Sequence, residues 1–389
     1  MNTITARRAR GILAAGAIAV TAAALVGCSE AGAEPPAATT GSESNVDSSL
    51  DAALEAVSSP LDAYPIPSEP IDGVADLAGQ TVYYVPITLQ SPQFSIVSAQ
   101  LTEALGNVGI DVQVCDGKGN PSDIGSCIGQ GTQAGAAAIV TDAVPYGLAA
   151  NALDAAQAAG IPVIIANQIA DENHPTSETL GFVPAGGSDQ EVAIAQWITK
   201  DSDGTANILM NRTADGPSQK AYVQAGLDEL EQICPDCTVT INDVSSSNFP
   251  QVTPSVSAAL LNDPTIGYVV NDFAQFLQPT QGGVQAAGMI DSVKGVTGSV
   301  GVGGLQALAS GTYLYAATGQ ANAYQGWVEA DLALRLITGT PAPEYTIPVR
   351  LFTRDNIDSI ELTEEAEASG EWFGPTTFRD DFLALWGVA

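Results

Sequence analysis

Few residues in this 389-residue chain have the types and spacing that chemistry needs. The only histidine, His174, lies in the Pro-flanked loop Asn173-His174-Pro175, so we expect a solvated side chain and no Ser-His-Asp site. The Gly-rich stretches GKGNPSDIG and GVGGLQ do not follow the dinucleotide fingerprint, and the sequence contains no P-loop. We therefore predict that the protein is not an enzyme and uses no cofactor.

The five cysteines fall into one N-terminal residue, Cys28, and four later ones. An even number is typical of an oxidising compartment, and four cysteines allow three disulfide pairings. Pairing between near neighbours, Cys115 with Cys127 and Cys234 with Cys237, is the simplest of these. A redox role for the Cys-Pro-Asp-Cys run is the alternative. Because there is no second Cys-x-x-Cys and only one histidine, we predict no metal site.

The N-terminus carries an export signal. Three arginines within the first ten residues precede the apolar run Gly11–Leu25, which is too short and too rich in Ala and Gly for a stable membrane span. The run ends in Leu-Val-Gly-Cys28, which resembles the lipobox of bacterial lipoproteins. We therefore expect lipidation at Cys28 and a membrane-anchored protein outside the cytoplasm. The alternative is an ordinary secretory signal that happens to contain a cysteine.

The composition indicates a globular, strongly acidic protein. The net charge is −32, with only 12 lysines and arginines, so the chain lacks the clustered cations that nucleic acids require. Its length suffices for two domains of ordinary size.

We expect a signal over residues 1–28 and a tether over 29–79 that includes a short helix over 46–57.

The stretch Thr81–Phe94, TVYYVPITLQSPQF, changes character within a few residues. Its first half is almost wholly apolar and predicts a strand that is buried on both faces. Its second half is polar, and a helical pattern begins at Phe94. Ligands of open α/β sheets bind at the carboxyl ends of strands. We therefore predict that residues 90–94 form one wall of a binding site.

Strand and helix patterns alternate along the rest of the chain, which predicts parallel sheets with helices on both faces. A break over Pro184–Ser188 separates two such runs. In the first run we expect strands over 81–87, 110–115, 137–141, 161–166 and 178–183. In the second we expect them over 206–211, 238–243, 266–271, 299–303 (SVGVG) and 312–317 (TYLYAA). A long helix is expected over 327–337.

This order of elements resembles the type 1 periplasmic binding proteins, the ribose- and galactose-binding class of ABC-transporter receptors. The resemblance rests on a series of segments over residues 81–355: TLQSPQF, AAQAAGIPVIIANQ, GPSQKAYVQAGLDEL, YVVND, GVGGLQALASG and TGQANAYQGWVEADLALRLITG. It implies an α/β fold of two doubly wound parallel-sheet lobes joined by a three-stranded hinge. The implied lobes are residues 80–184 with 321–345 and residues 185–320 with 346–360, followed by a C-terminal extension over 361–389.

The resemblance also implies a ligand pocket between the lobes. Several sugar-clamping charges of the family are replaced by amides here, and amides suit neutral ligands that carry hydroxyl or carbonyl groups. Phe94 would supply a stacking face, so Phe94→Ala is expected to weaken binding without unfolding the first lobe. The alternative is that several of these amides only cap strand ends or pair across the hinge. The implied ligand-binding residues are Ser91, Gln93, Phe94, Asn167, Gln168, Lys220, Asn271 and Gln320.

The function that the resemblance implies is delivery of a small neutral polar molecule, such as a sugar, to ABC permease subunits by hinge closure. We expect a monomer held at the membrane through its lipid anchor, without a nucleic-acid partner. Two other functions are compatible with the same residues. One is a ligand sensor that reports to a membrane signalling receptor, and the other is a cell-envelope scaffold protein.

Overall fold

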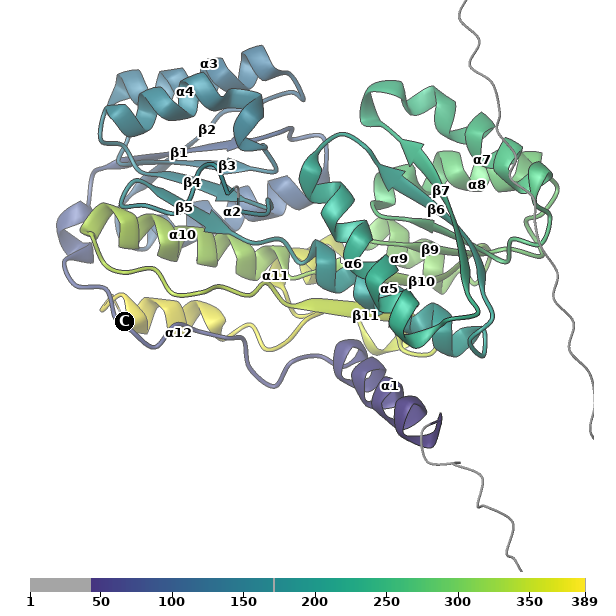
Figure 1. Cartoon of the computed structure of the whole chain (residues 1–389). Coiled ribbons are helices and arrows are strands. Elements are labelled where there is room, and N and C mark those ends of the chain that lie inside the picture. The colour runs from purple at the N-terminus through teal and green to yellow at the C-terminus, as the bar shows by residue number, and fades with distance from the viewer. Residues whose placement is uncertain (1–42, 171, 389) are drawn as a thin grey trace, which may run out of the picture. The chain divides into compact units, whose positions relative to one another are not determined.

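The computed structural model describes residues 43–170 and 172–388, which contain two β-sheets (Figure 1). The predicted signal, Cys28 and the tether up to residue 42 lie outside these residues. The described part begins with helix α1 (Glu43–Ser58), which includes the short helix predicted over 46–57. Among the described helices, none combines the length and the apolarity that a membrane crossing requires.

The first sheet contains five strands, and every neighbouring pair is parallel. Its order is β2-β1-β3-β4-β5, so the chain begins near the middle and moves outward on both sides. Helices α3 and α4 cover one face, and α2 packs on the other (Figure 1). The strands are β1 (Thr81–Pro86), β2 (Asp111–Val114), β3 (Ala138–Asp142), β4 (Val163–Ala166) and β5 (Leu180–Val183), and the helices are α2 (Pro92–Gly106), α3 (Pro121–Ala134) and α4 (Tyr146–Ala158).

The second sheet has the order β11-β10-β9-β8-β6-β7, with one antiparallel pair, β10 with β11. Helices α5 and α6 pack on one face, and α7 and α8 pack on the other. The strands are β6 (Asn207–Thr213), β7 (Thr238–Val244), β8 (Tyr268–Asn271), β9 (Lys294–Thr297), β10 (Leu314–Gln320) and β11 (Val349–Thr353). The helices are α5 (Gly187–Asp201), α6 (Pro217–Ile233), α7 (Val252–Asn262), α8 (Leu277–Ala286) and α9 (Val302–Ala309).

One predicted strand of this sheet is wrong. In the segment 299–303, SVGVG, the first three residues form a loop and the last two begin α9, while the strand lies before them, in β9. Val and Gly alternate in this segment with the period of a strand. The two valines supply the only apolar side chains of the pattern, which is too few to distinguish a strand from a helix. Leu305 and Leu308 are buried three residues apart, which is the spacing of a helix face.

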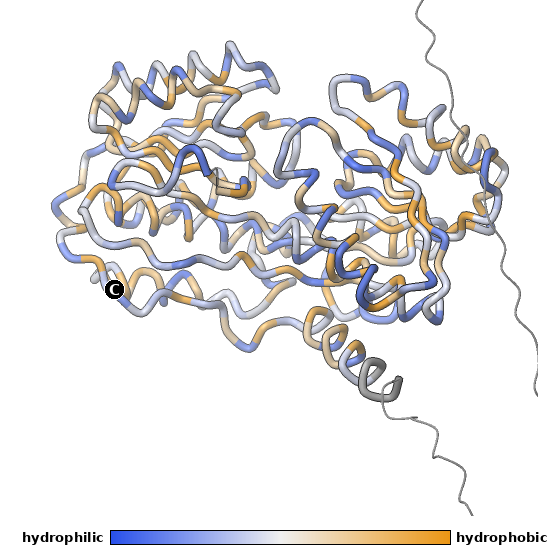
Figure 2. Tube along the Cα trace, in the orientation of Figure 1, coloured by the Kyte–Doolittle hydropathy of each residue, from blue (hydrophilic) through white to orange (hydrophobic). Residues whose placement is uncertain are grey.

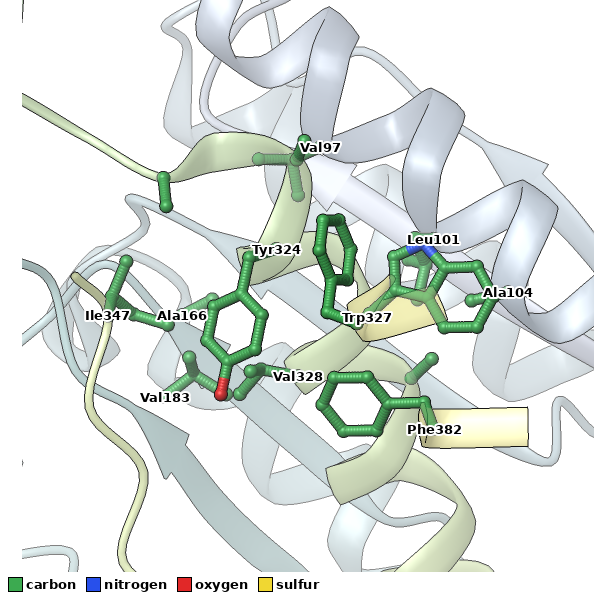
Figure 3. Close-up of a cluster of buried hydrophobic side chains, with 14 of the residues drawn as sticks. Val97, Leu101, Ala104, Ala166, Val183, Tyr324, Trp327, Val328, Ile347 and Phe382 are labelled. Atoms are coloured by element: carbon green, nitrogen blue, oxygen red, sulfur yellow. The ribbon is translucent and has the colours of Figure 1, made fainter. Parts of the chain in front are cut away.

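Helix α10 (Asn322–Thr338) follows the second sheet in the chain but packs on the first sheet and on α2. Every residue from 323 to 335 is buried, as expected for a helix covered on all sides. Figure 3 shows Tyr324 and Trp327 of α10 close to Val97 and Leu101 of α2 and to Phe382 of α12 (Phe378–Leu385). We call the first sheet with α2, α3, α4 and α10 the first lobe, and the second sheet with α5–α9 the second lobe.

The terminal segments tie these elements together. Helix α1 packs on α5 and β11, and the residues after it pair with the C-terminal segment through Leu61 N–H to the Phe373 carbonyl at 2.8 Å. The buried Arg350 of β11 donates to the carbonyls of Ser58 and Trp372.

Hydrophobic residues recur along the strands, while the outer helices carry more hydrophilic ones (Figure 2). The short helices are η1 (Val74–Leu77), η2 (Ser246–Gln251), η3 (Ala274–Phe276), η4 (Ile357–Ser359) and α11 (Glu364–Ser369).

Candidate functional site

The loop after β1 is held by the loop after β2. Asp116 Oδ1 accepts hydrogen bonds from the backbone N–H of Leu89 at 3.0 Å and of Lys118 at 2.9 Å. A disulfide between Cys115 and Cys127 closes this second loop onto α3. The loop that leads to residues 90–94 is therefore braced by a carboxylate and, through it, by a covalent link.

Phe94 is more buried than a residue needs to be in order to stack on a ligand, which is the role predicted for it. Ser91 and Gln93, at the start of α2, are half-buried, but only 4% of Phe94 is exposed. The hydroxyl oxygen of Tyr84 lies 3.4 Å from the Phe94 carbonyl oxygen, so β1 and the first turn of α2 are in contact. The ring is therefore enclosed by its neighbours, and its removal would leave a cavity.

Asn167 and Gln320, predicted in separate segments, are hydrogen-bonded to each other. Gln320 Nε2 donates to Asn167 Oδ1 at 2.9 Å, and Asn167 Nδ2 donates to Asp142 Oδ1 at 2.6 Å. Asn167 adopts φ 55°, a left-handed conformation that asparagine tolerates better than most residues. The structure thus brings two predicted residues together and adds Asp142, the last residue of β3.

Gln168 contacts the second lobe. Ser218, in the first turn of α6, donates from Oγ to Gln168 Oε1 at 2.9 Å and accepts from the Ile169 N–H at 3.2 Å. Tyr222, one turn later, donates to the Asn167 carbonyl at 3.3 Å. These bonds join the β4–β5 loop to the start of α6, and they use polar atoms that were expected to meet a ligand.

Asn271, at the end of β8, belongs to a separate network in the second lobe. Its Oδ1 accepts from Asn211 Nδ2 at 3.0 Å and from Thr280 Oγ1 at 2.7 Å. Its Nδ2 is buried and has no hydrogen-bond partner among the residues that the structure describes. The next residue, Asp272, accepts from the backbone N–H and the hydroxyl of Thr213, both at 2.7 Å.

Three buried carboxyl groups stand close to these amides. Burial raises the pKa of Asp142 to about 6 and the pKa of Asp272 to about 7. Burial, followed by the charge of Asp272, raises the pKa of Glu191 well above its ordinary value. A Cβ added at Gly298 would lie 2.4 Å from the Asp272 carbonyl and 3.5 Å from Glu191 Oε1, so a glycine is needed there. At neutral pH the site carries less negative charge than its carboxyl count suggests.

Other predicted residues lie farther from this arrangement. Lys220 is exposed on α6, although the buried Ser218 on the same helix contacts the first lobe.

The ring of His174 stacks on Tyr146 with 3.6 Å between centroids. Within residues 43–170 and 172–388 there is no group of three or more His, Cys, Asp or Glu side chains that could hold a metal ion. Both local cysteine pairs form disulfides in the structure.

The sequence patterns did not point to Asp142, Ser218 or Tyr222. Asp142 had a usable signal, because a single acidic residue ends the apolar run of β3 and should therefore be buried at the carboxyl edge. Ser218 and Tyr222 had no such signal, because their partners lie about 50 residues away in the other lobe.

Comparison with known proteins agrees with this architecture. A family model described as periplasmic binding protein domain matches residues 82–341. A search of curated proteins gives no match. Among solved structures, a Mycobacterium smegmatis protein in complex with β-D-fucofuranose is 19% identical, with a TM-score of 0.63 over 75% of this chain and 96% of that chain.

Two further structures are similar. A 5-methylthioribose transporter solute-binding protein from Thermotoga lettingae is 16% identical, with a TM-score of 0.65 over 78% of this chain and 96% of that one. A Bacillus halodurans ABC-transporter solute-binding protein with bound myo-inositol is 18% identical, with a TM-score of 0.63 over 72% of this chain and 97% of that one. At these identities the likeness shows the fold.

Proposed function

The chain belongs to the periplasmic binding protein domain family, and from this premise we propose that it is the extracytoplasmic solute receptor of an ABC importer. Its ligand is a small neutral molecule rich in hydroxyl groups, a sugar or a polyol. The ligand binds between the lobes and favours their closed arrangement by its higher affinity for that arrangement. The protein is a monomer, anchored through a lipid on Cys28, and it passes its ligand to permease subunits.

The observation that carries this proposal is the unpaired Nδ2 of Asn271. A buried N–H donor without a partner is costly, by about 1–3 kcal/mol, and a ligand oxygen would remove that cost. Asn271 lies at the carboxyl end of β8, the edge at which open α/β sheets bind ligands. The donor is uncharged, which suits a hydroxyl or ring oxygen.

The other polar groups support a neutral ligand. The residues predicted to bind the ligand all have amide side chains, except for Ser91, Phe94 and the exposed Lys220. The neighbouring carboxyls Asp142 and Asp272 already accept hydrogen bonds from protein groups. Burial also raises the pKa of Asp272 to about 7, so that group carries only part of a negative charge at neutral pH. The similar solved structures hold fucofuranose, 5-methylthioribose and myo-inositol, which are uncharged and carry several hydroxyls.

A thermal-shift screen with sugars, polyols and nucleosides tests this function. A ligand present at about a hundred times its Kd should stabilise the folded state by about 2.7 kcal/mol. Asn271→Ala should abolish that shift. Asn207→Ala, at the opposite end of the second sheet, should preserve it, because the Asn207 side chain bonds to Asp263, Thr265 and Thr238 at that end. If no sugar or polyol shifts the wild-type protein, the receptor function is wrong.

A further inference from the structure

One hydrogen-bonded chain joins β1, β3, β4 and the end of β10. It begins at Asp142, which accepts from the Tyr84 hydroxyl at 2.7 Å and from Asn167 Nδ2 at 2.6 Å. It continues through Asn167 Oδ1, which accepts from Gln320 Nε2 at 2.9 Å. It ends where Gln320 Oε1 accepts from the backbone N–H of Gly186 at 3.0 Å.

The direction of this chain is fixed at both ends. An ionised carboxylate can only accept hydrogen bonds, so the NH2 group of Asn167 must face Asp142. A backbone N–H can only donate, so the oxygen of Gln320 must face Gly186. The bond between the two amides then has a single possible polarity, from Gln320 nitrogen to Asn167 oxygen. Two independent anchors therefore require the same orientation.

We infer that Asp142 is a positioning residue for ligand binding. It fixes the orientation of the side-chain amides of Asn167 and Gln320, and with it the direction in which their NH2 groups point. This inference rests on the proposed function and deepens it. Asp142 is fully buried, so it acts on a ligand only through these amides. Gly186 lies between β5 and α5, where the chain passes from the first lobe to the second. The hydrogen bonds from Asp142 through Asn167 and Gln320 therefore reach the segment that connects the two lobes.

The surroundings of Asp142 make its charge sensitive to pH. The titratable groups that face it are Tyr84 from β1, Glu329 from α10 and Tyr222 from α6. Burial and the charge of Asp142 raise the pKa of Glu329 well above its usual range, so the charges of these two carboxyl groups disfavour each other. Protonation of Asp142 would place a hydrogen on one of its two oxygens. The neutral acid accepts hydrogen bonds more weakly than the carboxylate, so it would hold the Asn167 amide less firmly.

The first experiment needs no ligand. In the full chain labelled with 15N-asparagine, the Asn167 side-chain amide signal, assigned by its loss in Asn167→Asp, should move with pH around a midpoint of about 6. Asp142→Asn should abolish this titration. Asp201→Asn should not, although Asp201 also accepts from a tyrosine hydroxyl, that of Tyr268, because it lies at the end of α5. An Asn167 signal in the wild-type protein that ignores pH would overturn the inference.

A second variant covers the case in which Asp142→Asn does not fold. The Tyr84 hydroxyl lowers the pKa of Asp142 through its hydrogen bond. Tyr84→Phe keeps the carboxylate and its bond to Asn167 but removes this stabilisation. The midpoint of the Asn167 signal should therefore rise above that of the wild-type protein. An unchanged midpoint would contradict the proposed chain of bonds.

The last experiment measures affinity with ribose, galactose and myo-inositol as probes. Asp142→Asn should weaken binding about tenfold, the value of one fixed hydrogen bond, and its Kd should be constant between about pH 5 and about pH 8. The wild-type Kd should rise several-fold toward the acid end. Equal Kd values and equal pH profiles would make Asp142 structural only. A wild-type protein that binds no probe would overturn the proposed function and the binding role of Asp142, while the amide titration would still decide whether Asp142 orients Asn167.

Discussion

Ser218 and Gln168 join the two lobes without a ligand. The Ser218 hydroxyl donates to Gln168 Oε1 at 2.9 Å and accepts from the Ile169 N–H at 3.2 Å, so one oxygen serves two groups of the first lobe. Both side chains are buried. A ligand that enters between the lobes therefore finds an inter-lobe contact already formed on one side.

Ser218→Ala should favour separation of the lobes. The change leaves two groups of the β4–β5 loop unpaired and should shift the open–closed equilibrium by about 1 kcal/mol, or roughly fivefold. Energy transfer between dyes on the exposed positions Gln130 and Gln285, each replaced by cysteine, measures the lobe distance. Ser310→Ala removes an exposed hydroxyl that bonds within its own turn and should have no effect. Identical transfer in the two variants would mean that Ser218 does not hold the lobes together.

The fold was largely predictable because each strand and helix repeats a local pattern. The strand over 81–87 and the helix that begins near Phe94 appear in the structure as β1 and α2. The pattern failed at residues 299–303, where glycine carries no side chain to reveal which period applies. Local periodicity also cannot state which sheet a helix covers, and α10 shows this, since it follows β10 but packs on the first lobe.

The site was only partly predictable, because its residues are joined across long sequence separations. The bond from Gln320 to Asn167 spans 153 residues, and the bond from Tyr84 to Asp142 spans 58. Positions at strand ends can be read from the sequence, since the carboxyl ends of parallel strands share an edge. The partner that each amide selects depends on side-chain geometry, which no spacing encodes.

The expected effect of Phe94→Ala needs revision. Because only 4% of Phe94 is exposed, truncation to alanine should cost about 3–5 kcal/mol of stability as well as binding. Phe94→Leu keeps most of the volume, so it should retain the fold and weaken sugar binding about threefold to tenfold by removing the ring face. Urea unfolding and calorimetric titration measure the two effects.

A buried phenylalanine elsewhere provides the control for that pair of measurements. Phe378 of α12 is also buried, and it packs against Tyr64 and Trp327. Phe378→Leu should lower stability without changing affinity. If Phe94→Leu and Phe378→Leu have the same binding constants as the wild-type protein, Phe94 does not touch the ligand.

Glu191 should make the protein less stable as pH rises. Its folded pKa lies above its unfolded one, so the folded state binds more protons between these two values and stability falls as pH increases through that window. Asp272, with a folded pKa of about 7, contributes in the same direction from about pH 4 upward. Glu191→Gln is neutral at every pH and should flatten the decline, as measured by urea unfolding from about pH 5 to about pH 8.

The exposed Glu231 of α6 serves as the reference for this pH series. Glu231→Gln removes a carboxylate from the exposed face of α6 and should leave the slope unchanged. A Glu191→Gln protein with the wild-type slope would show that Glu191 is not the group whose protonation is linked to folding.

The two disulfides should differ in what their loss costs. They close loops with sequence separations of 12 and 3, for which the chain-entropy model gives about 3 and about 2 kcal/mol. Only the Cys115–Cys127 bridge holds the loop of Asp116, which in turn anchors Leu89 at the entrance to residues 90–94. The Cys234–Cys237 bridge lies at the C-terminal end of α6, far along the helix from Ser218.

Paired serine variants separate these effects. Replacing Cys115 and Cys127 together should lower the free energy of unfolding more and also weaken sugar binding several-fold, because the loop after β1 loses its brace. Replacing Cys234 and Cys237 should lower stability by about 2 kcal/mol and leave affinity intact. Urea unfolding and titration with myo-inositol distinguish the two pairs. Equal affinities in both variants would mean that the bridge near Asp116 serves folding alone, and that the loop after β1 keeps its shape through the Asp116 hydrogen bonds without it.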